Sequence, residues 1–152
     1  MIKKCVWIIL VVVLLSITAF KWPMSFDAFF MEHDSVLVIQ TKNDVINGVP
    51  SLETKRYTVN KDSDEYEQLK SLFADHSYHR RISSLYDKTS FKGDKGETSY
   101  MISFAKGNDA IDFMLPYENG GGIIDRRIYS LSSYEKLVSG LEQILVNLIP
   151  EE

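Results

Sequence analysis

An uncharged, apolar run near the amino terminus constrains this chain more than any other feature. It extends over 16 residues from Cys5 to Phe20, and lysines flank it on both sides. This length lies between the core of a secretory signal peptide and a complete membrane-spanning helix. Both interpretations direct the chain to a membrane, so residues 5–21 predict the membrane contact.

The flanks of the run favour an uncleaved anchor over a cleaved signal. A cleavage site requires small residues at positions −3 and −1, whereas the best candidate places Ile17 and Ala19 there, followed by the bulky Phe20. In an anchor, Lys21 snorkels and Trp22 lies at the headgroup level, which extends the span to about 18 residues, marginally enough for ~27–30 Å of hydrocarbon. Secretion after signal cleavage stays open as the alternative.

Charge asymmetry predicts the topology. Lys3, Lys4 and the α-amino group precede the run, while only Lys21 follows it closely. The positive-inside rule therefore places the amino end in the cytoplasm and the remainder of this single-pass chain outside the cell membrane.

Cysteine and sequon usage narrows the compartment. The single cysteine, Cys5, precedes the apolar run, whereas the modified cysteine of a bacterial lipoprotein follows it. Beyond the anchor the chain has no cysteine for a disulfide and no Asn-x-Ser/Thr sequon. Both features favour a Gram-positive cell surface over a disulfide-rich animal secretome.

Three parts are expected: a membrane anchor at 1–21, an aromatic juxtamembrane segment at 22–33 and an extracytoplasmic domain at 34–152. Removing the anchor leaves about 120–130 residues, enough for a single core. From Trp22 onward, 14 Lys and Arg face 21 Asp and Glu, a net charge of −7. This balance argues against nucleic acid as a partner.

The juxtamembrane segment is too apolar for a free linker. Ser25 is positioned to cap a short helix that presents aromatic rings to the headgroup region, or the same rings pack under the domain as part of its core. The sequence leaves both alternatives open. The predicted membrane-interface residues are Lys3, Lys4, Lys21, Trp22, Phe26, Phe29 and Phe30.

The remaining periodicity predicts an α+β domain. Strands are expected over 35–41, 53–59, 78–82, 98–105, 110–115 and 123–129, and helices over 62–73 and 132–149. Capping boxes are expected at Asp62 with Glu65 and at Ser132 with Glu135. The predicted architecture is an antiparallel sheet of about five to six strands with two helices packed on one face.

Glycines 120–122, after Asn119, form the tract closest to a phosphate cradle. A strand rather than a helix is expected to follow this tract, so it predicts a hairpin turn instead of an anion site.

No recognised catalytic motif occurs. His76 and His79 have a metal-ligand spacing, but they lack a third ligand and straddle the end of a helix, where a cationic side chain ordinarily complements the dipole. They remain weak metal candidates, and we expect no catalytic residue and no cofactor. The only nucleophilic thiol, Cys5, belongs to the anchor.

Two basic pairs lie in predicted strands. If those strands are neighbours, guanidinium groups line up beside tyrosines, a combination typical of protein-binding surfaces. The alternative is charge pairing with nearby carboxylates. The predicted protein-binding residues are Tyr78, Arg80, Arg81, Arg126, Arg127 and Tyr129.

The layout of two lysines, a short span, an aromatic juxtamembrane stretch and a disulfide-free domain ending in Tyr-x-x-Leu-x-x-x-Leu resembles small single-span surface proteins of Gram-positive bacteria. Some proteins of that plan act as immunity proteins against envelope-targeted toxins, and the resemblance assigns no residue a role. We expect a non-enzymatic, membrane-anchored binding module with a protein partner. The alternatives are an immunity protein, an accessory subunit of a membrane complex, or an enzyme with an unfamiliar site.

Overall fold

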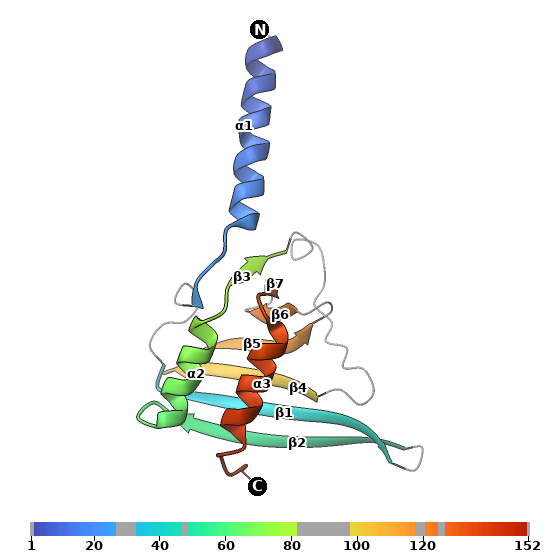
Figure 1. Ribbon diagram of the computed structural model, residues 1–152, viewed down its shortest axis with the longest axis vertical. Coiled ribbons are helices and arrows are strands. Elements are labelled where there is room, and N and C mark those ends of the chain that lie inside the picture. Colours follow the sequence, from blue (N-terminus) through green and yellow to red (C-terminus); the bar gives the residue numbers. More distant parts are fainter. Residues whose placement is uncertain are drawn as a thin grey trace.

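The computed structural model describes residues 2–26, 33–46, 49–81, 98–117, 121–124 and 127–151. A long helix, α1 (Ile2–Lys21), extends away from an α+β domain, which confirms the predicted fold class (Figure 1). The elements of the domain are β1 (Ser35–Ile46), β2 (Val49–Asn60), α2 (Asp64–Ala74), β3 (Tyr78–Arg80), β4 (Thr98–Lys106), β5 (Asp109–Tyr117), β6 (Gly121–Ile124), β7 (Arg127–Leu131) and α3 (Tyr134–Leu145).

The described strands form one antiparallel sheet in the order β2-β1-β4-β5-β6-β7-β3. Seven strands replace the five to six expected, because the segment 123–129 was wrongly predicted to be a single strand. It contains the end of β6 and most of β7, which pair with each other around residues 125–126. Those two linking residues lie outside the described part of the chain.

Part of the tract predicted to form a turn belongs to a strand. Gly121 and Gly122 lie within β6, where a side chain at either position would collide with its neighbours, whereas residues 119 and 120 lie outside the described part. A Cβ on Gly121 would lie 2.8 Å from the Tyr129 carbonyl oxygen, and one on Gly122 would lie 2.9 Å from the Phe113 ring. The glycines therefore permit close packing of β6.

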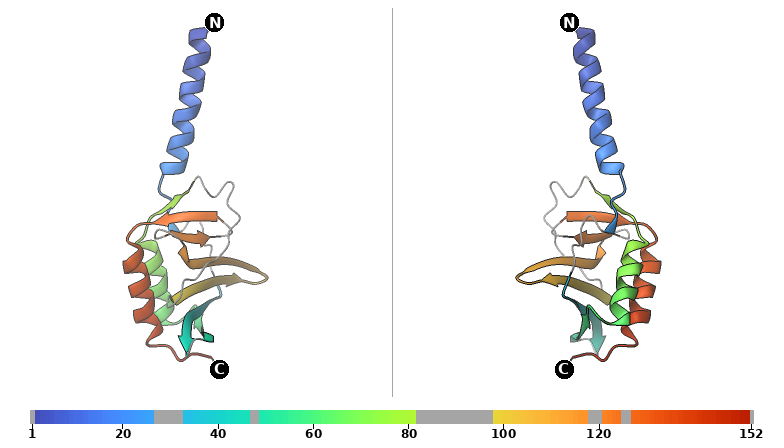
Figure 2. Two further views of the ribbon diagram at one scale, coloured as in Figure 1. Left: turned by 90° about the vertical axis from the view of Figure 1, so that its right-hand side faces the viewer. Right: turned by 90° about the vertical axis from the view of Figure 1, so that its left-hand side faces the viewer.

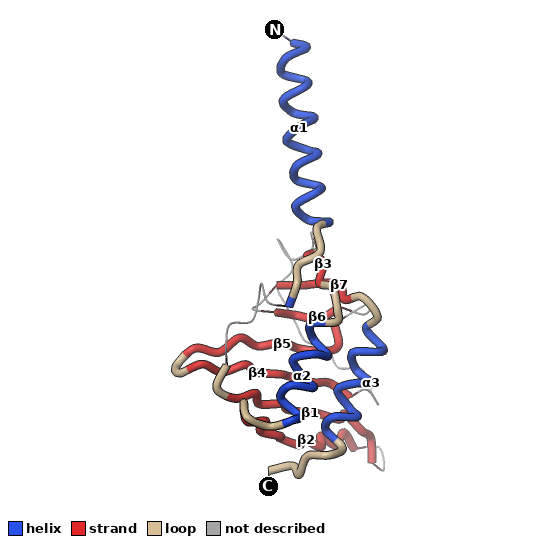
Figure 3. The backbone as a smooth tube through the Cα atoms, turned by 60° about the vertical axis from the view of Figure 1, so that its left-hand side comes forward, coloured by secondary structure: helices blue, strands red, loops and turns tan. Residues whose placement is uncertain are grey.

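Helices α2 and α3 pack side by side on one face of the sheet (Figures 2 and 3). The core lies between this layer and the strands, where alternate residues point toward the helices. The largest fully buried side chains of this core are Tyr78, Tyr100, Tyr129, Phe73, Phe113, Leu69, Ile102, Leu115, Ile124, Leu137 and Leu141.

The helix caps differ from the expected capping boxes. Ser63, rather than Asp62, caps α2, and its side chain accepts a hydrogen bond from the Tyr66 amide at 3.2 Å. At α3 the N-cap is Ser133, which makes no side-chain cap bond. The Ser132 hydroxyl instead accepts a bond from the Ser77 amide at 2.9 Å, and thus joins the start of β3 to the end of β7.

The segment after α1 is attached to the sheet. The backbone groups of Met24 and Tyr78 exchange hydrogen bonds of 2.9 and 3.3 Å, so this segment borders the edge strand β3. Phe26 is buried and stacks on Phe73 with the ring centroids 5.4 Å apart. Two alternatives were open for the juxtamembrane rings, the headgroup region and the core. Phe26 lies in the core.

Helix α1 is apolar, and its described side chains, from Lys4 to Thr18, are exposed. Within the described ranges, however, no helix combines the length and the apolarity required of a membrane crossing.

Candidate functional site

The face of the sheet opposite α2 and α3, here called the helix-free face, carries an apolar row across its strands. The register places Ile39 of β1 opposite Met101 of β4, and Met101 opposite Met114 of β5. Since facing residues in an antiparallel sheet point to the same side, these three side chains are neighbours. The row continues through Ile123 and Ile128, which are buried.

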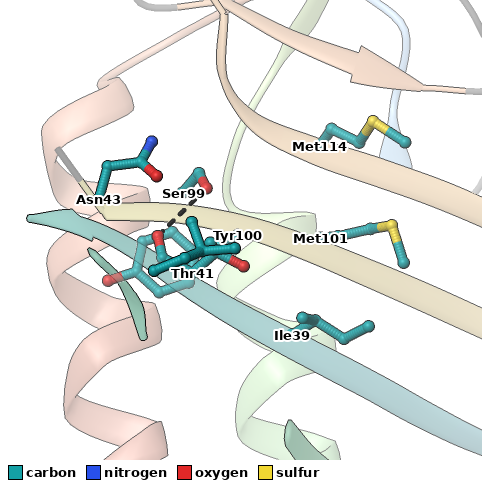
Figure 4. A pocket seen from close by; sticks show the side chains of 8 residues that line it. Ile39, Thr41, Asn43, Ser99, Tyr100, Met101 and Met114 are labelled. Carbon is teal, nitrogen blue, oxygen red and sulfur yellow. Dashed lines mark hydrogen bonds between the residues drawn. The ribbon is translucent and has the colours of Figure 1, made fainter. Parts of the chain in front are cut away.

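A hollow of about 460 Å³ opens on the helix-free face beside this row (Figure 4). The apolar side chains of Ile39, Met101 and Met114 line it, and the neutral polar side chains of Thr41 and Ser99 lie beside them. The Ser99 hydroxyl donates to the Thr41 carbonyl oxygen at 3.2 Å, which fixes this part of the wall. The lining residues are Ile39, Thr41, Asn43, Leu52, Ser99, Tyr100, Met101 and Met114.

The wall behind the hollow is held by a hydrogen-bond chain on the helix side of the sheet. Tyr100 donates to a carboxylate oxygen of Glu142 on α3 at 2.7 Å and accepts a bond from the Gln40 amide at 3.3 Å. The side-chain oxygen of Gln40 accepts a weaker hydrogen bond from the Tyr57 hydroxyl at 3.5 Å. Burial and the Glu142 carboxylate raise the pKa of Tyr100 above its ordinary value, so the phenol remains a donor.

Charge is sparse around the hollow. None of the described residues that line it is charged. The nearest cation on the same face is Arg56 of the edge strand β2, which is exposed and lies opposite Ile39. On this face the Asp112 carboxylate of β5 accepts a short hydrogen bond from Ser103. Strands β1 and β4 lie between β5 and β2, so this carboxylate is not a neighbour of Arg56. The hollow therefore suits an apolar group, and Arg56 adds a positive charge beside its Ile39 wall.

The two weak metal candidates lie on different elements. The ring Nδ1 of His76 lies 2.7 Å from the Leu72 carbonyl oxygen at the end of α2, as expected of a helix-terminal histidine. His79 belongs to β3, and its Nε2 lies 3.4 Å from the Ser77 hydroxyl. Within the described residues, no group of three His, Cys, Asp or Glu side chains is arranged to hold a metal ion.

The predicted arginine and tyrosine surface is not formed as expected. Strands β3 and β7 are neighbours, with Arg80 opposite Tyr129. Yet Tyr78 and Tyr129 are buried, and the Tyr78 hydroxyl donates to the Phe73 carbonyl oxygen at 2.8 Å. These two tyrosines belong to the core and cannot contact a partner.

The arginines of that surface are divided between the two faces of the sheet. Arg80 and the exposed Arg127 share the side of Tyr129, because Arg80 is paired with Tyr129 across the strands and Arg127 lies two residues before it on β7. Arg81 lies on the helix-free face, close to Gly121. Arg126 lies outside the described residues.

The predicted membrane-interface residues are also divided. Lys4 and Trp22 are exposed, whereas Phe26 is only 5 % exposed and so does not lie at a lipid surface. Lys3 and Lys21 belong to α1, but their side chains lie outside the described part, as do Phe29 and Phe30 entirely.

Sequence reasoning missed the methionines of the hollow. Alternation within 98–105 and 110–115 does place Met101 and Met114 on the side away from the core, and this was the available signal. The pairing of β1 with β4, which adds Ile39 to them, joins segments about sixty residues apart and has no local signature.

Comparison with known proteins finds no match: no family model, no curated protein and no solved structure matches this chain.

Proposed function

We propose that this chain is a non-enzymatic binding module that α1 holds at a membrane, with its α+β domain on the extracytoplasmic side. One observation carries the proposal. The large apolar side chains of α1 between Val6 and Ile17 are each 48–69 % exposed, so the domain covers none of them. Such a large contiguous apolar surface is rare on soluble monomers and marks a contact with lipid or protein.

The apolar surface surrounds α1 on every side. The ten residues from Val6 to Leu15 are all large and apolar, and they span nearly three helical turns. A helix that packs on one partner surface needs only an apolar stripe, whereas a helix apolar all round suits lipid or a fully enclosing environment. A lipid environment therefore explains the whole circumference.

The polar side chains of this stretch are compatible with lipid. The Ser16 hydroxyl donates to the Val12 carbonyl oxygen at 2.8 Å, and the Thr18 hydroxyl donates to the Leu15 carbonyl oxygen at 2.9 Å. Polar groups in hydrocarbon must be satisfied internally, and these bonds do so within the helix.

The length of α1 makes the anchor a short one. Its 20 residues rise about 30 Å, whereas the part from Lys4 to Thr18 rises only about 22 Å. Crossing a full hydrocarbon layer therefore depends on the ends of the helix as well, and a lysine at such an end is tolerated because its long side chain permits snorkelling. The greater number of lysines before the apolar run favours a cytoplasmic amino end.

The binding half of the proposal is supported by the helix-free face. Its hollow is lined by apolar and neutral polar side chains, among them Met101 and Met114. Methionine is flexible and polarizable, and it is common on surfaces that adapt to partners. This composition suits recognition.

Membrane fractionation tests the anchor on the full chain. We expect the wild-type chain to stay in the membrane pellet after alkaline carbonate washing, and a Val11→Arg, Leu15→Arg variant to be released. The matched control is Val146→Arg, Ile149→Arg, which places the same charges on exposed apolar residues outside α1 and should stay in the pellet. Retention of the α1 variant would contradict lipid anchoring.

Chemical crosslinking in intact membranes tests the module. A protein captured by the wild-type chain and also by the released α1 variant supports binding by the domain. A protein captured only by the anchored chain favours an accessory subunit whose interface is α1. Deletion of residues 1–31 is the poorer tool, because it removes Phe26 from the core and Met24 from the edge of β3.

Protease treatment of whole cells tests the orientation. We expect cleavage of the domain by protease added outside, and protection of the domain would overturn the proposed topology.

A further inference from the structure

We infer that the hollow on the helix-free face binds an extended peptide segment of a protein partner, one that inserts an apolar side chain and presents an acidic side chain to Arg56. This assignment rests on the proposed function and names the class of partner that the module recognises. It depends on four features of the hollow and its surroundings.

The first feature is the lining. A volume of about 460 Å³ lies within the range of small-ligand and side-chain pockets. Its apolar lining includes Ile39, Met101 and Met114, and no described lining residue is charged. A charged group would lose its hydration there without an opposite charge to replace it, so the inserted group is apolar.

The second feature is an available amide at the rim. Asn43 lines the hollow and is half-buried, and its side chain makes no hydrogen bond with the described residues. Figure 4 shows it beside Ser99 and Thr41. A carboxamide offers both a donor and an acceptor, as does a peptide group, so the two match each other in a way that a hydrocarbon chain does not.

The third feature is the position of Arg56. Its side chain is exposed, and the two salt bridges among the described residues, Lys55 with Glu53 and Lys42 with Asp44, do not include it. Arg56 lies directly opposite Ile39, so their side chains are about 5 Å apart at Cβ. In an extended peptide, residues i and i+2 point to one side about 7 Å apart, which fits an apolar group in the hollow and a carboxylate at Arg56.

The fourth feature is the distance from the proposed membrane. Helix α1 joins the domain beside β3, at one edge of the sheet, whereas Ile39 lies on β1, five strand spacings away (Figure 1). At about 4.8 Å per spacing the separation is roughly 24 Å. Lipid chains of the anchoring bilayer do not reach the hollow, and this favours a peptide over an acyl chain as its occupant.

Methyl spectroscopy of the full chain in lipid nanodiscs tests the assignment. With ¹³C-methyl methionine, Met101 and Met114 report the hollow directly, and M101L and M114L variants assign their signals. The probes are three blocked heptapeptides with Gly and Ser flanks: one with central Leu followed two residues later by Asp, one with Lys in place of Asp, and one with Ser in place of Leu. Sodium decanoate is the fourth probe.

We expect the Leu and Asp peptide to shift both methyl signals and to bind about tenfold more tightly than the other two peptides. Arg56→Glu should reverse the preference between the Asp and Lys peptides. Asn43→Ala should weaken the binding of both Leu-containing peptides. Arg127→Glu is the matched control, since it makes the same charge change at an exposed arginine on the other side of the sheet and should leave binding unchanged.

Three results would overturn the assignment. They are unchanged Met101 and Met114 signals at millimolar peptide, equal binding of the Asp and Lys peptides, and binding of decanoate without binding of the peptides, which would assign the hollow to a fatty acid. The membrane crosslinking described above does not depend on Met101 or Arg56. If the chain captures a partner in that experiment but the peptides do not shift its methionine signals, the proposed function stands and only this assignment is removed.

Discussion

The hydroxyl of Tyr100 on β4 donates a 2.7 Å hydrogen bond to the carboxylate of Glu142 on α3. It is one of the few polar links between the sheet and the helix layer among the described residues, and it lies directly behind the hollow. The link therefore couples the position of α3 to the wall of the candidate site.

Tyr100→Phe removes this link without changing the ring. Hydrogen bonds to charged acceptors contribute about 1.5–3 kcal/mol, and the exposed position of Glu142 reduces the value here, so we expect the free energy of unfolding to fall by about 1 kcal/mol. Urea denaturation followed by circular dichroism measures it. Tyr57→Phe, which loses only a 3.5 Å bond to Gln40, should cost less. An equal loss in both variants would contradict the assigned role.

Phe26 connects the segment after α1 to the core. Its ring lies 5.4 Å from that of Phe73 and 5.9 Å from that of Phe104, centroid to centroid. Phe26→Ala should therefore lower the free energy of unfolding by about 3 kcal/mol, the lower part of the range for buried phenylalanine. Trp22→Ala is the control, because Trp22 is 71 % exposed and should change stability by less than about 0.5 kcal/mol. Similar losses in both would place Phe26 outside the core.

Gly140 permits the close contact of α3 with α2. A Cβ at this position would lie 2.5 Å from Cδ1 of Leu72, so alanine overpacks the contact. Overpacking costs about 1–3 kcal/mol and exceeds the gain of about 1 kcal/mol in helix propensity, so Gly140→Ala should destabilise the fold by roughly 1 kcal/mol.

In a Leu72→Ala background the sign of this effect should reverse. The obstructing methyl group is then absent, and only the propensity gain remains, so Gly140→Ala should stabilise the protein. The four chains of this double-mutant cycle are compared by their denaturation midpoints. The same effect of Gly140→Ala in both backgrounds would exclude the contact as its cause.

His33 gives the fold a dependence on mildly acidic pH. It is buried against the Phe104 ring, 5.1 Å away between centroids. Burial, and secondly the charge of Lys106, lower the pKa of His33 below 6.5, while Asp34 opposes them. As the pH falls below 6.5, the unfolded chain binds a proton that the folded chain still excludes, so stability decreases with falling pH. Denaturation between pH 7 and pH 5 should show this slope, and His33→Phe should flatten it. A slope unchanged by His33→Phe would assign it to other groups.

Local sequence pattern predicted the elements whose signals are local. The hairpin of β4 and β5 is confirmed, because its apolar residues alternate and Gly107 takes the positive φ of 57° that its turn requires. Helix α2 is confirmed within two residues at its start, although Ser63 caps it in place of Asp62. Residue propensity and hydrophobic periodicity suffice to predict an element when the interactions that form it join residues within about ten positions of one another.

The errors arose where distant contacts decide the structure. Gly121 and Gly122 resemble a turn in sequence but pair with β7 in a strand, where Tyr129 and Phe113 leave no room for larger residues. Tyr78 resembles an interface residue but is buried, since its hydroxyl finds a backbone acceptor at Phe73. The hollow requires the register of β1, β4 and β5, which only the folded sheet defines.

The pairing of Met24 with Tyr78 has a mechanical consequence. A pull along α1 reaches the domain at this backbone pair, on the margin of the sheet rather than at its centre. The two Met24–Tyr78 hydrogen bonds bear the load first, and after they break the load passes along the chain to the buried Phe26. The long β1 and β2 hairpin at the opposite margin, together with the hollow beside it, is shielded from the load as long as these two attachments hold.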